Sequence, residues 1–193
     1  EVGGGENAPE INPHWGEPDM TLAERVFASN TFEVRAFETG NPKSPANAIP
    51  PSAVVFGHLR YVVGTDISKL MPLLRAHLDK HGFNDITITS ERDMMPATRL
   101  DPDHPWAKWA IGSLSKTADD EIAVVPNLGG SLPNDVFADL LGLPTIWVPH
   151  SYGGCSQHAP NEHILESISK SALRLMTGLW WDLGEGNTPR QVS

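Results

Sequence analysis

Apolar and polar residues alternate early in the chain and predict two successive strands. In residues 31–40, TFEVRAFETG, the alternation places Phe32, Val34 and Ala36 on one face. Residues 52–64, SAVVFGHLRYVVG, form a long run of β-branched and aromatic residues, which is typical of a second strand.

A helical repeat of apolar residues follows these strands. The segment 66–82 places one apolar stripe along a helix, with Asp66 as the expected N-cap and Gly82 as the stop. The stripe consists of Ile67, Leu70, Met71, Leu74 and Leu78. Pro72 interrupts the pattern, so we expect a start near Ser68 or a kinked first turn. Residues 84–92 alternate again and predict a strand, which gives β-β-α-β for the first half.

The second half predicts helices and strands in alternation. They are a helix near 105–116, a strand at 121–127, a helix at 133–142, a strand at 144–151 and a helix at 161–182. Such alternation is typical of an α/β layer with at least partly parallel strands. We therefore predict two units, residues 1–95 and residues 96–193.

Composition and charge narrow the classes of function. The 193 residues are 39% hydrophobic, so the chain can bury a core. A net charge of −10 argues against a nucleic-acid or membrane-surface partner. The single cysteine excludes an intramolecular disulfide framework. Because the sequence shows no apolar run long enough to span a bilayer, we expect a soluble, cytoplasmic protein.

Three candidate binding positions each have a structural alternative. The turn NLGGSLPND, residues 127–135, includes Gly130 and Ser131; its backbone N–H groups could bind an anion, or its glycines could simply permit a tight turn. Arg60 could present its guanidinium to a carboxylate, or lie outward as an ordinary strand charge. Asn47 could contact a substrate through its amide, or initiate a turn.

The segment SYGGCSQHAPNEH, residues 151–163, is the most informative stretch of the sequence. His158 ends a glycine-rich loop before a predicted helix, where a neutral imidazole suits zinc, although a lone histidine is more often a loop residue. Cys155 and His158 could instead form a nucleophilic pair, but no third residue is placed to orient them. His150 and His163 complete no zinc motif by their spacing.

Three segments, in this order, resemble metallopeptidase family 20: NAIPPSAVVFGHLRYVVGTD, PNLGGSLPNDVFADLLGLPTIWVPH and CSQHAPNEH. The family includes carnosinase-like dipeptidases, aminoacylases, acetylornithine deacetylase and succinyl-diaminopimelate desuccinylase. The resemblance covers roughly residues 25–183. It implies a zinc-dependent amidohydrolase with an α/β catalytic domain and an inserted ferredoxin-like lid, which commonly forms a homodimer contact. Residues 1–95 would be the β-β-α-β part of the lid, and residues 96–193 the C-terminal half of the catalytic domain.

The resemblance also implies roles for individual residues. His158 matches a metal ligand, in a His-x-x-[ND]-E pattern. Arg60 matches a lid arginine that holds the substrate's terminal carboxylate, and Asn47 matches a neighbouring substrate contact. Gly130 and Ser131 match a turn that contacts the substrate. The expected substrate is a dipeptide or an N-acyl amino acid with a free carboxylate.

The other family ligands find no match in this sequence. There is no Glu-Glu dipeptide, and the only His-x-Asp, at residues 77–79, lies within the predicted helix. We therefore expect an incomplete two-zinc site, inactive without an N-terminal half supplied by a second chain or a missing segment. The alternatives are a non-catalytic binding or assembly module that keeps the fold, and a cysteine hydrolase that uses Cys155.

Overall fold

A computed structural model describes residues 10, 12–90, 95–125 and 127–189. The chain divides into two units, Ala28–Ala97 on the one hand and Glu1–Phe27 with Thr98–Ser193 on the other. The first unit thus begins at Ala28, whereas the sequence placed residues 1–95 together. The assignment of the two units as lid and catalytic half stays a prediction.

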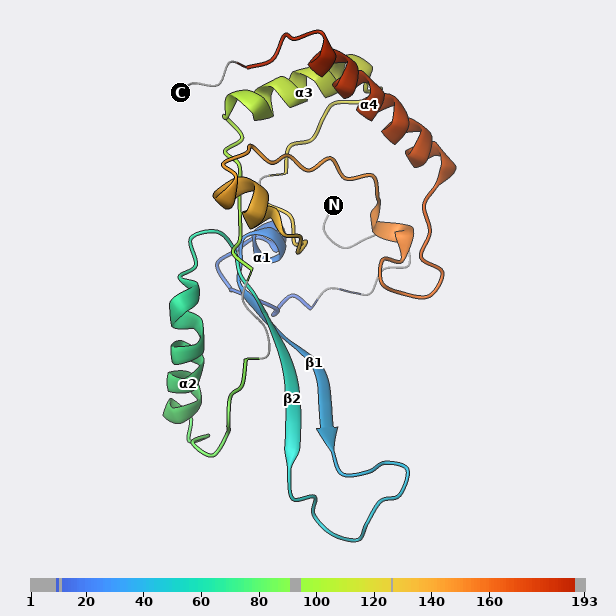
Figure 1. The fold of residues 1–193 in the computed structure, drawn as a ribbon. Coiled ribbons are helices and arrows are strands. Elements are labelled where there is room, and N and C mark those ends of the chain that lie inside the picture. The colour runs from blue at the N-terminus through green and yellow to red at the C-terminus, as the bar shows by residue number, and fades with distance from the viewer. Residues whose placement is uncertain (1–9, 11, 91–94, 126, 190–193) are drawn as a thin grey trace. The chain divides into compact units, whose positions relative to one another are not determined.

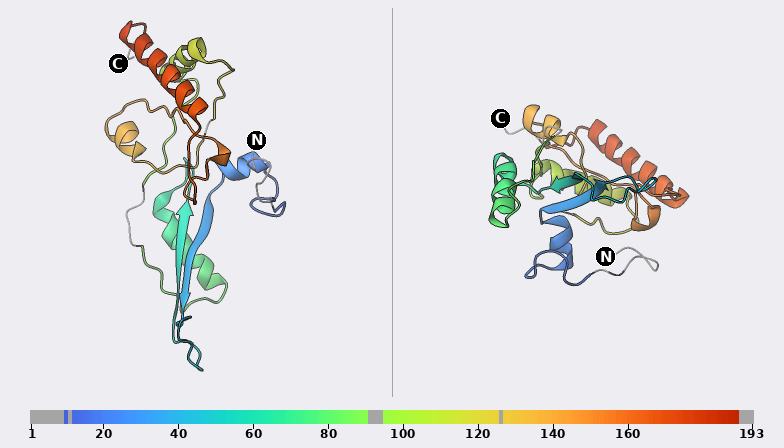
Figure 2. Two further views of the ribbon diagram at one scale, coloured as in Figure 1. Left: turned by 90° about the vertical axis from the view of Figure 1, so that its right-hand side faces the viewer. Right: turned by 90° about the horizontal axis from the view of Figure 1, so that it is seen from below.

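The unit Ala28–Ala97 is built around an antiparallel pair of strands, β1 (Thr31–Thr39) and β2 (Ala53–Arg60). Figure 2 shows the pair as a long twisted ribbon, with residues 40–52 connecting the strands at one end. Both predicted strands are confirmed, since they occupy nearly the predicted ranges.

A bulge between Val34 and Ala36 changes which side chains share a face of this ribbon. Val34 pairs with Gly57 and Ala36 with Phe56, which are consecutive residues of β2, so Val34 and Ala36 lie on opposite faces. The prediction that Phe32, Val34 and Ala36 share one face is therefore wrong for Ala36. Because of the bulge, Phe37 lies on the same face as Phe32 and Val34.

The resulting faces differ in character. One is wholly apolar apart from Thr39 at its end, and the Phe32 ring covers Gly57, where an added Cβ would lie 2.4 Å from the ring atom Cζ. The other face carries charge, including Glu33, His58 and Arg60. On the apolar face Phe32 is 54% exposed and Phe37 63% exposed. This face is open to a further layer of structure.

The predicted helix after the strands is confirmed with a modified start. Asp66 accepts a hydrogen bond from the Ser68 amide at 3.1 Å and caps the short 3-10 turn η1 (Ile67–Lys69), which leads into α2 (Leu70–Lys80). Pro72 lies in the first turn of α2, where amide groups have no intrahelical partner, so the proline costs no hydrogen bond.

The end of α2 is closed by a Schellman motif. The amide of Phe83 donates to the Leu78 carbonyl at 2.9 Å, and the amide of Gly82 donates to the Asp79 carbonyl at 3.1 Å. Gly82 has the left-handed φ of +82° that this motif requires. Gly82 is therefore the stop that the sequence predicted.

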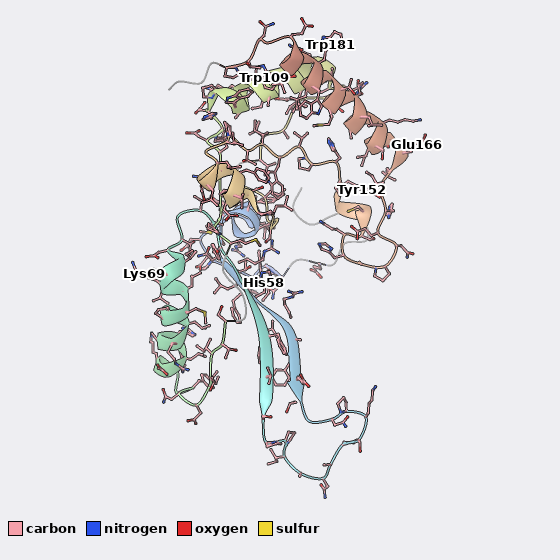
Figure 3. The ribbon with its side chains drawn as sticks, in the orientation of Figure 1. His58, Lys69, Trp109, Tyr152, Glu166 and Trp181 are labelled. Carbon is pink, nitrogen blue, oxygen red and sulfur yellow. The ribbon has the colours of Figure 1, made fainter. Side chains whose placement is uncertain are left out.

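The other unit contains a helix pair, α3 (Pro105–Thr117) and α4 (Glu166–Gly184). The two helices lie against each other, with the C-terminal end of α3 beside the second half of α4 (Figures 1 and 3). Gly178 is the point of close approach, since an added Cβ would lie 2.6 Å from Cγ2 of Thr117. Ala110 and Leu114 on α3 are buried. The predicted helix 105–116 is thus confirmed, whereas the last helix begins at Glu166 instead of residue 161.

A short helix, α1 (Leu22–Phe27), was not predicted. Its signal is present in the sequence as a capping box: the Thr21 amide donates to Glu24 Oε2 at 2.8 Å, and the Glu24 amide donates to Thr21 Oγ1 at 3.3 Å. From this helix the buried Arg25 donates to the carbonyls of Pro13, Trp15, Pro18 and Met20. One guanidinium therefore holds the preceding loop together.

Three predicted strands do not form in the part of the chain that the structure describes. They are residues 84–92, of which 84–90 are described, residues 121–127, of which 126 is not described, and residues 144–151. Apolar residues of these segments, such as Val124, Val125 and Ile146, are exposed. A strand needs a hydrogen-bonded neighbour, and the described sheet consists of β1 and β2 alone. The predicted parallel strands are thus replaced by extended segments, and the helix 133–142 by a π-helical turn, η2 (Val136–Leu140).

Candidate functional site

The loop of residues 151–163 is closed on itself by Tyr152 and His163. The Tyr152 hydroxyl lies 2.6 Å from Nε2 of His163, and the two rings meet edge to face at 5.9 Å and 76°. Nδ1 of His163 lies 2.7 Å from the Asn161 carbonyl, and the His163 amide donates to the Cys155 carbonyl at 3.0 Å. Figure 3 shows Tyr152 at the start of this loop. Both ring nitrogens of His163 are engaged, so His163 supports the loop and is no free metal ligand in this conformation.

Backbone strain is concentrated in the same loop. Ser156, His158 and Asn161 have φ values of 57°, 61° and 65°, in the left-handed region. Residues other than glycine adopt this region at a cost of roughly 1 kcal/mol, and such residues gather at functional sites. Asparagine and histidine are among the residues other than glycine that adopt this region most often, whereas serine is not, so nothing in the sequence marked Ser156.

Glu162 holds the backbone of the predicted metal ligand. Its Oε2 accepts a hydrogen bond from the His158 amide at 3.2 Å. The predicted His-x-x-[ND]-E pattern thereby acquires a physical role, because the glutamate fixes the turn on which the histidine lies. Within the described residues the His158 imidazole makes no hydrogen bond, so its ring nitrogens are available to a ligand.

Cys155 is buried in the centre of the loop, within the 3-10 turn η3 (Gly153–Cys155). The Ser151 hydroxyl donates to its Sγ at 3.1 Å, and this hydrogen bond lowers the pKa of the Cys155 thiol. The charge of Glu162 acts in the opposite direction more weakly. No pattern in the sequence predicts the contacts of Ser151 and Tyr152, because both depend on how the loop folds back.

The described residues contain no group of three or more His, Cys, Asp and Glu side chains that could hold a metal ion. His158 can therefore supply one imidazole to a zinc site, but the described part of this chain does not complete it. The predicted incompleteness of the two-zinc site stays a prediction.

Gly130 lies against the indole of Trp147. An added Cβ at Gly130 would be 2.9 Å from Cζ3 of Trp147, so a larger residue would push the ring away. Ser131 is exposed beside it. Gly130, Ser131 and His158 belong to the same unit, although no described hydrogen bond joins Ser131 to His158.

Arg60 and Asn47 belong to the other unit and lie at opposite ends of β2. Arg60 is half-buried as the last residue of the strand, opposite Thr31. Asn47 is exposed in the connection 40–52, which Figure 1 shows at the far end of the ribbon. The 8 residues of β2 span roughly 25 Å. The structure thus does not bring these two predicted substrate contacts together within one chain.

A comparison with solved structures places this arrangement among known proteins. The chain matches the crystal structure of an M20 family metallo-carboxypeptidase, Sso-CP2 from Sulfolobus solfataricus, with a TM-score of 0.66 and 26% sequence identity. The chain resembles an M20 metallopeptidase. The match covers 82% of this chain and supports the predicted family, metallopeptidase family 20, and the predicted α/β class. No protein-family model and no curated protein matches the sequence.

The match covers 36% of the carboxypeptidase chain, so this sequence spans about a third of the length of that protein. The described helices include none long and apolar enough to cross a membrane.

Proposed function

We propose that this chain is the C-terminal portion of a zinc-dependent amidohydrolase or peptidase that cleaves dipeptides or N-acyl amino acids with a free carboxylate. The observation that carries the proposal is the likeness to a metallo-carboxypeptidase over 82% of the chain. The strained His158 loop supports it, because backbone strain is retained where a side chain must be held in one position.

His158 is proposed to bind one zinc ion, and the remaining ligands are proposed to come from an N-terminal half, as a second chain or another segment of the protein. When bound, zinc polarises an amide carbonyl and lowers the pKa of a coordinated water. Glu162 holds the His158 backbone, and the contact between Tyr152 and His163 holds the loop ends. These residues position the imidazole without touching the substrate.

Arg60 is proposed to align the substrate's free carboxylate through its guanidinium. Gly130 and Ser131 are proposed to contact the substrate. Asn47 lies in the connection that precedes β2, whereas Arg60 ends the strand, so the two cannot contact the same small substrate within one chain. If both bind substrate, we propose that they do so in different copies of a homodimer formed through the lid.

A second candidate is a non-catalytic binding or assembly module that keeps the fold. It is favoured by the lack of a three-ligand metal group among the described residues. The two candidates differ in whether the complete protein hydrolyses a carboxylate-bearing amide.

The test measures zinc content and hydrolysis of dipeptides and N-acyl amino acids, with the chain alone and with the N-terminal half added. We expect the complete protein to hold zinc and hydrolyse substrate, and the chain alone to do neither. His158→Ala in the complete protein should lower activity at least about a hundredfold and release zinc, since even partners of metal ligands contribute about 10–100-fold. His14→Ala, which removes an exposed histidine, is the matched control and should leave both unchanged.

The proposal fails if the complete protein holds no zinc, or if His158→Ala retains full zinc content and activity. Zinc binding without hydrolysis of any carboxylate-bearing amide would favour the binding module.

A further inference from the structure

The last turn of α2 carries two imidazoles on one face. His77 and His81 are four residues apart, and their ring centroids lie 4.5 Å apart at an interplanar angle of 45°. Residues at i and i+4 of a helix are neighbours on its surface, so the two side chains project the same way. Both residues are exposed.

This spacing is held by the backbone. His81 follows the last residue of α2, but its amide still donates to the His77 carbonyl at 3.2 Å, so the helical turn between the two residues is closed. The Schellman hydrogen bonds of Gly82 and Phe83 fix the chain immediately after it. The fold therefore fixes the Cα positions of His77 and His81. Rotation of the two exposed side chains is then enough to bring a nitrogen of each ring to one ion.

The surrounding charges permit a cation. The partial negative charge of a helix C-terminus favours positive ions. Two basic side chains, Arg75 and Lys80, lie on this part of the helix, and Arg75 is paired with Asp79 at 2.6 Å. Lys80 lies about 60° around the helix from His77 and about 100° from His81. Its long side chain can extend into solvent.

We propose that His77 and His81 form a two-imidazole site for a divalent late transition-metal ion. Neutral imidazole nitrogens suit copper, nickel and zinc, and affinity for such ligands is greatest for Cu²⁺. Two protein ligands leave the remaining coordination positions to water or to an added ligand. The site lies in the unit Ala28–Ala97 and is separate from the proposed zinc ligand His158.

The test is a titration of the full chain with Cu²⁺ at a pH slightly above neutrality, followed by calorimetry and by electron paramagnetic resonance of the bound ion. We expect a site with two coordinated imidazole nitrogens. His77→Gln or His81→Gln should each raise the Kd at least about tenfold, because joining two ligands on one scaffold raises their effective concentration. The double variant should add little to either single one.

Two controls separate the spacing from the mere number of histidines. The double variant His77→Gln with Ala76→His keeps the number but sets the imidazoles five residues apart, on different faces of the helix, and should bind as weakly as His77→Gln alone. His58→Gln, which removes a histidine of β2 in the same unit, should leave the affinity unchanged. Far-UV circular dichroism verifies that each variant keeps its helices.

The proposal is overturned if the five-residue spacing binds Cu²⁺ as tightly as the unaltered chain, or if the single variants retain the two-nitrogen spectrum. His158→Ala is expected to leave this site intact. The failure of the two-imidazole proposal and the failure of the proposed hydrolase are thus distinguishable.

Discussion

The Tyr152 hydroxyl and Nε2 of His163 lie 2.6 Å apart and join the two ends of the loop that carries His158. The other ring nitrogen of His163 faces the Asn161 carbonyl, which can only accept a hydrogen bond. In the neutral ring Nδ1 therefore carries the proton, and Nε2 accepts from Tyr152. His163 thereby shapes the loop around His158, whose ring makes no hydrogen bond with the described residues.

Tyr152→Phe tests this closure. We expect faster hydrogen exchange at the His163 amide and a loss of about 1 kcal/mol in the stability of the loop, the usual net contribution of one hydrogen bond. The measurement is amide exchange by NMR, with ¹⁵N shifts of His163 reporting its tautomer. Tyr61→Phe, which alters the other tyrosine of the chain, should leave the exchange of His163 unchanged; equal exchange in Tyr152→Phe and the unaltered chain would contradict the closure.

Ser151→Ala tests the control of the Cys155 thiol. Because donation from the Ser151 hydroxyl lowers the pKa of this thiol, its removal should raise the pKa. Thiolate forms then at higher pH, so the pH profile of alkylation of Cys155 by iodoacetamide should move upward. Ser156→Ala, in the same loop, is the matched control. A profile that stays in place in Ser151→Ala would show that the hydroxyl does not act on the thiol.

Gly178→Ala tests the contact between α3 and α4. The added methyl group would meet Thr117, and overpacking of this kind costs about 1–3 kcal/mol in the free energy of unfolding. Gly112→Ala is the control, since an added Cβ at this position in α3 meets nothing within 4 Å. It should stabilise by about 0.5–1 kcal/mol, because alanine favours a helix over glycine. Urea denaturation followed by circular dichroism measures both changes, and a gain in Gly178→Ala would contradict the close approach.

Acid should weaken the same helix pair. Hydrogen bonds from Lys116 and Arg174 lower the pKa values of Asp182 and Asp119, respectively, below the ordinary aspartate value of about 3.9. The unfolded chain therefore binds protons at a higher pH than the folded chain. The stabilisation is complete above the ordinary value and is lost as the pH falls through the lower, folded-state values.

The urea midpoint should accordingly decrease between about pH 5 and about pH 2. Asp182→Asn should flatten this decrease, because it removes the carboxylate that pairs with Lys116. Asp139→Asn, which alters an exposed aspartate of η2, is the control and should leave the slope unchanged. An unchanged slope in Asp182→Asn would show that its pair with Lys116 does not contribute.

Local signals in the sequence were sufficient for elements that depend on their own residues. The stop at Gly82 needs a left-handed glycine, and the cap at Asp66 needs a short acceptor side chain, so both were predicted correctly. The capping box at Thr21 and Glu24 is equally local and was missed only because the flanking segment is rich in glycine and proline.

Elements that need a distant partner could not be predicted in the same way. Residues 121–127 and 144–151 have strand-like composition, yet a strand forms only beside another strand, and the described residues offer these segments none. The bulge between Val34 and Ala36 likewise depends on how β1 pairs with β2, and it decides which side chains share a face.

The sequence by itself determined the α/β class, the β1–β2 ribbon and three of the helices, because these follow from short-range patterns. His158 became the candidate ligand through the resemblance of its segment to metallopeptidase family 20. Only the tertiary structure decided that Glu162 and the Tyr152–His163 pair hold the His158 loop, and that Asn47 and Arg60 lie at opposite ends of a strand. Distances between side chains depend on how the backbone folds back on itself, and that path is not encoded in the spacing of residues along the chain.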